Sequence, residues 1–488
     1  MRVSAGLDAV AQADLVRRGE AAPRELVEAA IERIEATDPQ INAITHRRYE
    51  QALDEAGRIR GDAPFAGVPT LVKALNDSKG DPANYGCAWV AGHGRVARED
   101  AVITRRLRRA GFVVVGQTST PEFGLLSVSE SGVHGVTRNP WRTDVTSGGS
   151  SGGASAAVAA GMVPVAQGGD GGGSIRMPAA FCHLLGLKPS VGRISAGPGR
   201  PSRWGHSVPA VVTRTVRDTA AVLDAVSGGA PGDRGGPAPL PADGLAALVG
   251  RDPGRLRIGV LAHAPDHAPQ VAPPVREAVL DTARILERLG HEVEHAYPEP
   301  MLDPMCLKAF FDALSVTVVQ TVEALSAELG ERPGPDDLDA VTRFWLRRGS
   351  EITGLELAEA FAWQERLRAD MADWWLRFDL LLSPVFATPP KPVGWPWQEA
   401  DGLRKSVDVL TFTAPFNTTG QPAIAVPAHL TESGEPIGIQ LAAAYGREDL
   451  LVSVAAQLEA ERPWDSLRPP VFADDMPMPR LSRDRSGR

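Results

Sequence analysis

Two glycine runs that carry serines constrain this chain more than any other feature of its sequence. Residues 146–153 read TSGGSSGG, and residues 168–176 read GGDGGGSIR. Glycine permits positive φ and lets backbone N–H groups approach a ligand closely, because it has no Cβ. A serine beside clustered N–H groups supplies what acyl transfer needs, a nucleophile and a cradle for the oxyanion. The two runs therefore predict a site for acyl transfer.

A short alanine-rich segment joins the two runs. Residues 154–160 read ASAAVAA, and Gly161 and Pro164 follow. Alanine favours helix, whereas glycine and proline end one. We expect a short helix here that carries the chain from the first run to the second.

The overall charge argues against two classes of partner. The net charge is −9 and the pI is about 5.7, so whole-chain electrostatics favour neither nucleic acid nor an anionic membrane. No window offers the ~20 apolar residues that a membrane span needs. We expect a protein that has no nucleic-acid partner and no membrane attachment.

The cysteines and the N-terminal residues indicate a reducing compartment. Cys87, Cys182 and Cys306 are odd in number and far apart, which fits neither a disulfide framework nor a CxxC site. Residues 1–8 lack the apolar stretch of a signal peptide. We expect a cytoplasmic protein.

Helix-like and strand-like segments alternate along the chain. Apolar residues at helical spacing follow Pro23, and residues 100–118 read as a helix and then a strand. The same order recurs at 275–293 and at 375–382. Recurrent units of this kind predict an α/β protein in which helices cover a sheet. The stretch 228–253, rich in glycine and proline, is expected to be a surface connection.

Further motifs accompany the glycine runs. GVPTLVK stands at 67–73, GLKPSVGR at 186–193, RNPW at 138–141, PFNTTGQPA at 415–423 and PIGIQL at 436–441. Together with GGSSGG and G-x-D-x-G-G-S-I-R-x-P-A, they resemble the pattern of the amidase signature family.

The resemblance implies one domain rather than several. Length alone would suggest about three domains, but large single α/β domains are common exceptions. The implied fold is one large domain, residues 1–470, with a mixed twisted β-sheet covered on both sides by α-helices. Residues 471–488, rich in proline, aspartate and arginine, are expected to form a loose tail.

The resemblance also implies which residues do the chemistry. Ser174 matches the nucleophile, Ser150 the serine that follows a cis peptide bond and relays protons, and Lys73 the base. A serine hydroxyl is a weak nucleophile without a base. Lys73 accepts a proton only when it is neutral, so burial has to lower its pKa from the usual value of ~10.4. No metal or cofactor is required.

The backbone of the second run is expected to bind the oxyanion. The donors would be the N–H groups of Gly171, Gly172, Gly173 and Ser174. Asp170 is expected to hold the loop in shape through backbone hydrogen bonds. Arg176 would either steer a substrate carboxylate or form a buried structural pair.

One position departs from the family pattern. The residue directly after the lysine is usually acidic in the family, and here it is Ala74. This puts the support of Lys73 in question, but not the lysine itself.

Two other motifs suggest different chemistry. His291 and His295 in HEVEH match a zinc-protease pattern, which needs a helix, but the segment alternates like a strand and follows Gly290. Residues 148–152, GGSSG, fit a nucleophile elbow, but residues 144–147 form a poor strand and no histidine stands in a convincing partner context. We favour neither interpretation.

The substrate is less constrained than the reaction. Gly124 and Leu125 belong to a segment that, by resemblance, passes close to the scissile group, so we expect them to bind substrate. Residues 192–195, 415–425 and 442–451 resemble most the family members that open a cyclic amide dimer, which makes a cyclic amide one candidate.

We therefore expect a hydrolase of carboxylic amides that acts on a small-molecule amide, with a homodimer as a possible assembly. One alternative is the glutaminase subunit of a tRNA-dependent amidotransferase, which normally carries an Asp-Asn pair directly after the lysine, where this chain has Ala74 and Leu75. Another is a member of the same fold that transfers the acyl group to an amine instead of to water.

Overall fold

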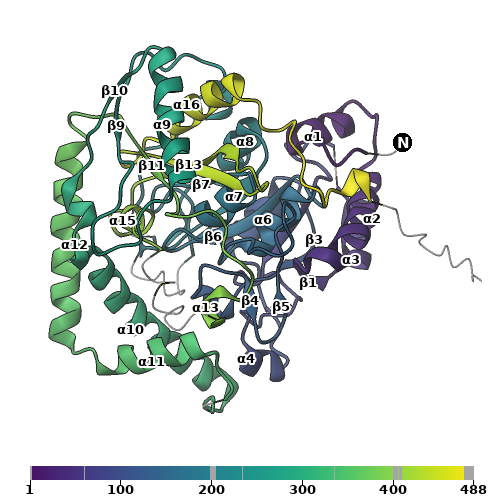
Figure 1. The fold of residues 1–488 in the computed structure, drawn as a ribbon. Coiled ribbons are helices and arrows are strands. Elements are labelled where there is room, and N and C mark those ends of the chain that lie inside the picture. The colour runs from purple at the N-terminus through teal and green to yellow at the C-terminus, as the bar shows by residue number, and fades with distance from the viewer. Residues whose placement is uncertain are drawn as a thin grey trace, which may run out of the picture.

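The fold is built around a large mixed sheet (Figure 1). The computed structural model describes residues 3–59, 61–197, 205–233, 235–334, 336–398, 405 and 409–476. Within these residues, eleven strands form one sheet in the order β1-β3-β2-β6-β8-β7-β12-β13-β11-β9-β10, and β4 and β5 form a small hairpin.

The strands have the following bounds. They are β1 Ile44–Arg47, β2 Pro69–Lys73, β3 Val113–Thr118, β4 Glu130–Ser131, β5 Gly135–Val136, β6 Val165–Asp170, β7 Leu185–Lys188, β8 Val208–Thr213, β9 Arg257–Val260, β10 Glu292–Glu294, β11 Leu380–Pro384, β12 Ala423–Leu430 and β13 Pro436–Ala443.

Parallel and antiparallel pairs occupy different parts of the sheet. β3, β2 and β6 are mutually parallel, and so are β11, β9 and β10. The strands between these two groups pair antiparallel. Every residue of β2 and β3 is buried, as expected for parallel strands that lie inside a protein.

The helices have the following bounds. They are α1 Ala9–Arg17, α2 Pro23–Ile41, α3 Tyr49–Ala56, α4 Ala88–Gly92, α5 Val102–Arg109, α6 Gly152–Ala159, α7 Arg176–Phe181, α8 Val216–Val226, α9 Pro273–Arg288, α10 Pro304–Leu329, α11 Ala340–Glu351, α12 Gly354–Trp374, α13 Trp395–Gln398, α15 Ala414–Thr418 and α16 Glu448–Glu461. Short 3₁₀ turns are η1 Glu122–Gly124, η3 Ala246–Leu248, η4 Glu299–Leu302 and η5 Ala473–Asp475.

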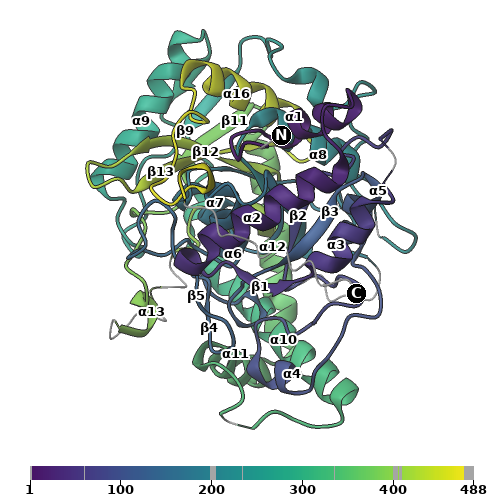
Figure 2. The ribbon, with the colours of Figure 1, turned by 90° about the vertical axis from the view of Figure 1, so that its right-hand side faces the viewer.

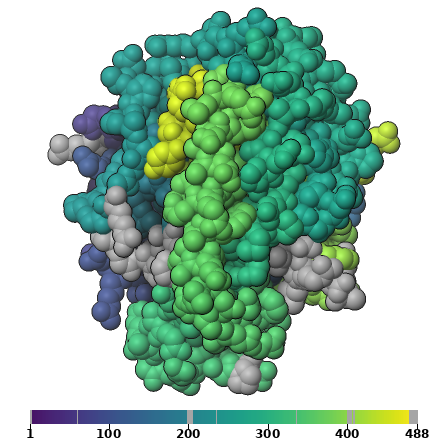
Figure 3. All heavy atoms as spheres, turned by 90° about the vertical axis from the view of Figure 1, so that its left-hand side faces the viewer, coloured from purple at the N-terminus to yellow at the C-terminus, as the bar shows by residue number. Residues whose placement is uncertain are grey.

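Helices flank the sheet, and two groups of them lie at opposite sides of the molecule. α1, α2 and α3 lie at one side of the molecule, and the long helices α10, α11 and α12 lie at the other (Figures 1 and 2). Figure 3 shows α12 running down the outer surface of that second group. The expectation of an α/β domain with a mixed sheet and flanking helices is confirmed.

The sequence predicted several local elements correctly. The alanine-rich segment forms α6, and Gly161 follows its end at φ +74°. The strand expected after α5 is β3. Residues 292–294 of HEVEH form β10, so this segment is a strand and not a helix.

The end of the described chain is packed rather than loose. Val471, Phe472 and Ala473 are buried, and Ala473 donates its N–H to the carbonyl of Ala160 at 2.9 Å. Residues 477–488 lie outside the described residues, so the loose tail stays a prediction for them.

Helix α10 corrects one reading of the sequence. By length and apolar composition it could cross a membrane, with a mean hydropathy of 1.4 over 18 residues, although no such window was expected. More than half of that window is buried inside the protein, as it is in the core helix of a globular protein.

Candidate active site

The sheet brings Lys73 close to the second glycine run. Strands β2 and β6 are parallel neighbours, with Thr70 opposite Val165 and Leu71 opposite Ala166. The carboxyl ends of parallel neighbours meet at the same edge of a sheet. Lys73 ends β2, and Asp170, which lies within the second glycine run, ends β6. A lysine and a glycine loop that are about a hundred positions apart therefore become neighbours.

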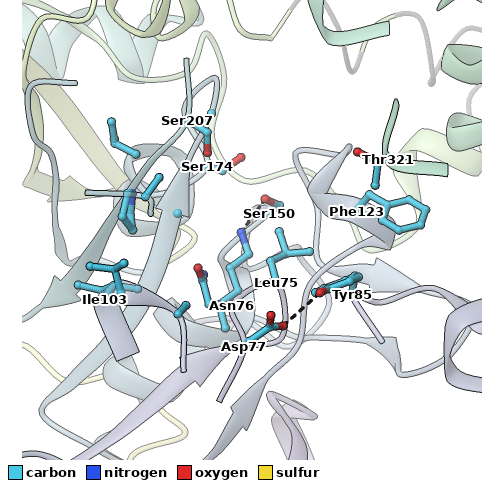
Figure 4. Close-up of a pocket in the computed structure, with 18 of the residues that line it drawn as sticks. Leu75, Asn76, Asp77, Tyr85, Ile103, Phe123, Ser150, Ser174, Ser207 and Thr321 are labelled. Atoms are coloured by element: carbon cyan, nitrogen blue, oxygen red, sulfur yellow. Dashed lines mark hydrogen bonds between the residues drawn. The ribbon is translucent and has the colours of Figure 1, made fainter. Parts of the chain in front are cut away.

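Lys73 points into the first glycine run. Its side chain is 1% exposed, and Nζ lies 2.7 Å from Oγ of Ser150 and 2.9 Å from Oγ of Ser151. Figure 4 draws the contact with Ser150 as a dashed line. The buried amine thus faces two hydroxyl groups that can exchange protons with it.

Gln167 supports the end of β2. The family pattern has an acid at the next position, where this chain has Ala74. The backbone N–H of Lys73 donates to Oε1 of Gln167 at 3.1 Å, and Nδ2 of Asn76 donates to the same oxygen at 3.1 Å. Ala74 is buried and donates its N–H to the carbonyl of Thr118 at 3.1 Å. The backbone around Lys73 is therefore held by neutral groups.

The first glycine run is packed against backbone from other segments. The peptide bond between Gly149 and Ser150 is cis, as the resemblance implies. A Cβ at Gly149 would lie 2.6 Å from the backbone of Val128, and one at Gly153 would lie 2.5 Å from the nitrogen of Ser119. These distances leave no space for any side chain.

Ser151 connects the two runs. Its N–H donates to the carbonyl of Ser174 at 3.1 Å, and its Oγ lies 3.2 Å from both the nitrogen and the oxygen of Gly169. These contacts give Ser151 a structural role between the two runs.

The side chains of Asp170 and Arg176 stabilise the conformation of the second run. Asp170 accepts the N–H groups of Gly173 at 2.7 Å, Ile175 at 3.1 Å and Arg176 at 3.3 Å. The guanidinium of Arg176 contacts both carboxylate oxygens at 3.0 Å, and both side chains are fully buried. The expectation that Asp170 shapes the loop is confirmed, and Arg176 forms a structural pair rather than a substrate contact.

The charge of this pair is fixed by its surroundings. Burial alone would raise the pKa of Asp170, but the charge of Arg176 and hydrogen bonds from Arg176 and Asn417 outweigh it and hold that pKa far below its usual range. Asp170 therefore stays ionised and does not compete for the protons of the hydroxyl groups nearby.

One predicted oxyanion donor is already engaged. The N–H of Gly173 points at Asp170, so Gly173 is wrong as a member of the oxyanion site. Within the described residues, no hydrogen bond engages the N–H groups of Gly171, Gly172 or Ser174. Thr413 fixes the loop by donating to the carbonyl of Gly172 at 2.5 Å.

A cavity of about 440 Å³ opens over these groups. Lys73, Ser150, Gly171 and Ser174 line it, and Ser174 is partly exposed to it. Figure 4 labels Ser174 and Ser150 among the residues that line this cavity. Among the described residues, the hydroxyl of Ser174 has no hydrogen-bond partner, so it is available to a ligand.

The segment expected to bind substrate contributes a different residue. Phe123 lines the cavity, whereas Gly124 and Leu125 do not. Phe123 has φ +50° within the η1 turn, and Leu125 instead packs against the main apolar core and two small apolar clusters. The substrate contact predicted for Leu125 is corrected to Phe123 for this cavity.

The sequence did not reveal the outer part of the cavity. Asp77, Tyr85 and Arg95 line it from the segment after β2, and Glu328 lines it from α10. Asp77 stands close to Lys73 in the sequence, but nothing local connects α10 with that segment.

The two alternative motifs find no support in their surroundings. His291 contacts Gln457 through Nε2 at 3.0 Å and accepts the N–H of Leu256 through Nδ1 at 3.2 Å. Across the described residues, no group of three His, Cys, Asp or Glu is arranged to hold a metal ion. Ser150 has Lys73, not a histidine, as its partner, and no described strand precedes the GGSSG segment directly.

Comparison with known proteins gives a consistent result. The Amidase family pattern matches residues 25–452. The chain is 38% identical over 486 residues to the 6-aminohexanoate-cyclic-dimer hydrolase of Paenarthrobacter ureafaciens, which covers 97% of this chain and 98% of that protein.

Solved structures agree with the sequence match. The structure of 6-aminohexanoate cyclic dimer hydrolase complexed with substrate superposes with a TM-score of 0.92 at 38% identity, covering 96% of this chain and all of that one. A bacterial aryl acylamidase has a TM-score of 0.83 at 27% identity, covering 94% of this chain and 96% of that chain. The chain therefore belongs to the amidase signature family of enzymes.

Proposed function

We propose that this amidase cleaves a carboxylic amide through an acyl-enzyme on Ser174, with Ser150 as proton relay and Lys73 as base. The observation that carries the proposal is the 2.7 Å contact between Nζ of Lys73 and Oγ of Ser150. It is buried, and it lies beside a cavity that contains the partly exposed Ser174.

Acylation would run along this contact. Oγ of Ser174 forms a bond to the amide carbon while its proton passes to Ser150, which in turn gives a proton to neutral Lys73. The C–N bond then breaks, and the amine leaves with a proton returned through Ser150. A water molecule repeats the path in reverse and releases the acid.

The negative charge that develops on the carbonyl oxygen needs N–H donors. Gly171, Gly172 and Ser174 supply the candidates, because the N–H of Gly173 is held by Asp170. Donors fixed in a loop of this kind stabilise the oxyanion without rearranging during the reaction.

The substrate is a small amide that fits the cavity. The similarity to an enzyme named for the 6-aminohexanoate cyclic dimer makes a cyclic amide the first substrate to test. A cytoplasmic location and a homodimeric assembly remain proposals from the sequence.

A fluorophosphonate probe that labels activated serines tests the nucleophile. We expect one adduct, on Ser174, mapped by mass spectrometry, and loss of amide turnover by roughly 10⁴-fold or more in Ser174→Ala. Ser207→Ala is the matched control, because Ser207 also lines the cavity and should leave labelling intact.

Other adduct positions would contradict the assignment. An adduct on Ser150 would make that serine the nucleophile. Glutamine hydrolysis that requires an added partner subunit would favour the amidotransferase alternative, and efficient transfer to an added amine would favour the acyl-transfer alternative.

A further inference from the structure

Gln167 and Asn76 form a short hydrogen-bonded chain at the end of β2. Oε1 of Gln167 accepts the backbone N–H of Lys73 and Nδ2 of Asn76, each at 3.1 Å, and its Nε2 donates to the carbonyl of Gly168. Gln167 is fully buried in β6 and does not line the cavity, whereas Asn76 lines it and is partly exposed. The chain therefore runs from the interior of the sheet to the cavity wall.

The neighbours of Gln167 fix the orientation of its amide group. A backbone N–H can only donate a hydrogen bond, and a backbone carbonyl can only accept one. If the oxygen and nitrogen of the amide were exchanged, its NH2 group would face the N–H of Lys73 and its oxygen would face the carbonyl of Gly168. Both contacts would be repulsive, so Oε1 is the atom that faces Lys73.

This orientation fixes that of Asn76 in turn. Because Oε1 of Gln167 accepts, the atom of Asn76 that faces it is the donor, Nδ2, and the carbonyl oxygen Oδ1 lies on the other branch of the side chain. Within the described residues, no hydrogen bond reaches Oδ1. Figure 4 labels Asn76 among the residues that line the cavity. Asn76 thus brings an acceptor to the cavity wall.

The cavity wall beside Asn76 is largely apolar. The carbonyl of Asp77 accepts the N–H of Ala101 at 2.9 Å, so the start of α5 lies next to the segment that follows β2. Residues 101–103 line the cavity from the start of α5, and Leu75 lines it from the other segment. Their apolar side chains cannot donate to Oδ1 of Asn76. The donor for this oxygen therefore comes from the contents of the cavity.

The free acceptor lets the cavity distinguish between ligands. Water satisfies an accessible carbonyl oxygen of this kind when no ligand is bound. A ligand that displaces the water and offers only apolar atoms leaves the oxygen unpaired, which lowers affinity. A ligand with an N–H group at the same point restores the hydrogen bond.

The position of Asn76 separates this acceptor from the scissile bond. The proton for the leaving amine comes through Ser150, which contacts Nζ at the tip of the Lys73 side chain. Asn76 shares Oε1 of Gln167 with the backbone N–H of Lys73, at the opposite end of that residue. A donor that reaches Asn76 therefore lies away from the scissile nitrogen.

We propose that Oδ1 of Asn76 accepts a hydrogen bond from a second N–H group of the substrate, outside the scissile amide, and that Gln167 is a positioning residue that orients this acceptor. This inference rests on the proposed function, because it concerns a molecule whose carbonyl reaches Ser174. It favours diamides and oligoamides, linear or cyclic, over monoamides of the same size.

Matched substrates test the preference directly. Acyl anilides with an acetamido group at the far end of acyl chains of increasing length form one series, read by aniline release. N-alkyl benzamides with the acetamido group at the far end of the alkyl chain form a second, read by benzoate release. Each substrate has a twin in which CH2 replaces the far N–H. We expect kcat/KM to be about tenfold higher for the N–H member at the best chain length of at least one series.

Three variants identify the acceptor. Asn76→Leu keeps a similar size without an acceptor, so the ratio should fall to about twofold or less, mainly through KM, because the contact forms on binding. Gln167→Met leaves Asn76 in place but unoriented, and should lower the ratio to about threefold. Thr321→Val is the matched control, because Thr321 lines the same cavity with a hydroxyl that donates to the carbonyl of Thr317 at 2.8 Å. This control should keep the wild-type ratio.

The outcomes separate this inference from the proposed function. Amide turnover with no preference for the far N–H in either series, at any chain length, would overturn the inference alone. A preference that survives in Asn76→Leu, or that is lost in Thr321→Val instead, would overturn the assignment to Asn76. An unchanged ratio in Gln167→Met would remove Gln167 from the proposal. Absence of both amide turnover and Ser174 labelling in the wild-type protein would overturn the proposed function, and the inference with it.

Discussion

Two buried lysines end strands of the same sheet, and their surroundings differ. Lys73 ends β2 and Lys188 ends β7, and both side chains are almost completely buried. Nζ of Lys73 faces the hydroxyls of Ser150 and Ser151 beside a cavity. Nζ of Lys188 donates to the carbonyl of Pro189 at 3.0 Å and does not line that cavity.

The difference shows that burial of a lysine does not by itself make a base. Burial, together with the charge of Arg176, lowers the pKa of Lys188 to about 7. A carbonyl can only accept a hydrogen bond, however, whereas a hydroxyl both gives and accepts a proton. The partner and the access to a ligand distinguish the two lysines, and each variant below tests that distinction.

The largest effect is expected from Lys73→Met. Removing the proposed base should lower kcat by about 10²–10⁴-fold, the usual contribution of general acid–base catalysis. Methionine fills a similar volume, so the fold should be retained. Single-turnover kinetics measure the loss, and a variant that keeps near-normal kcat would remove Lys73 from the mechanism.

The next effect separates the two serines that Lys73 contacts. Ser150→Ala should lower kcat by about 10²-fold or more, because the proton path is interrupted. Ser151→Ala should act mainly on stability, by about 1–3 kcal/mol, because it leaves the backbone of Gly169 without its partner. Equal losses of kcat in the two variants would contradict the distinction.

The smallest effect on activity is expected from Lys188→Met, which should change pH-dependent stability instead. The folded protein holds Lys188 with a pKa of about 7, against 10.5 for an ordinary lysine. Between these values the unfolded chain binds the extra proton, so this group makes wild-type stability rise with pH across that window.

Comparing the two proteins by urea unfolding isolates this contribution. The stability of Lys188→Met relative to wild type should be highest below pH 7 and should fall by up to about 1.4 kcal/mol per pH unit as pH rises from 7 towards 10.5. A difference that does not change with pH would show that Lys188 keeps its ordinary pKa. A large loss of kcat would place it in the mechanism.

What the sequence predicted is mostly local. Short-range preferences of glycine, alanine and alternating residues predicted three features. These are the loops at the glycine runs, the helix between them and the strand at HEVEH. The loop role of Asp170 also follows, because its hydrogen bonds reach only three to six residues ahead. The roles of Lys73, Ser150 and Ser174 came from a family resemblance and not from the residues alone.

The features that the sequence did not predict depend on backbone conformation and on contacts between segments of the folded chain. Gly173 was assigned to the oxyanion site because the turn that points its N–H at Asp170 has no signature in a run of glycines. Phe123 replaced Leu125 as a cavity residue because of an η1 turn with φ +50°. Glu328 stands 233 positions after Arg95, and only the packing of α10 brings them together.

The close packing of the first glycine run limits which of its residues can be replaced during evolution. Gly149 and Gly153 are surrounded by backbone atoms at 2.5–2.6 Å from any added Cβ, so the fold alone forbids their replacement. A descendant that lost its activity would keep these glycines and could lose its lysine and serines freely. In a related sequence, the glycines at these positions therefore indicate the fold. The residues at the positions of Lys73, Ser150 and Ser174 indicate whether the protein is still an active enzyme.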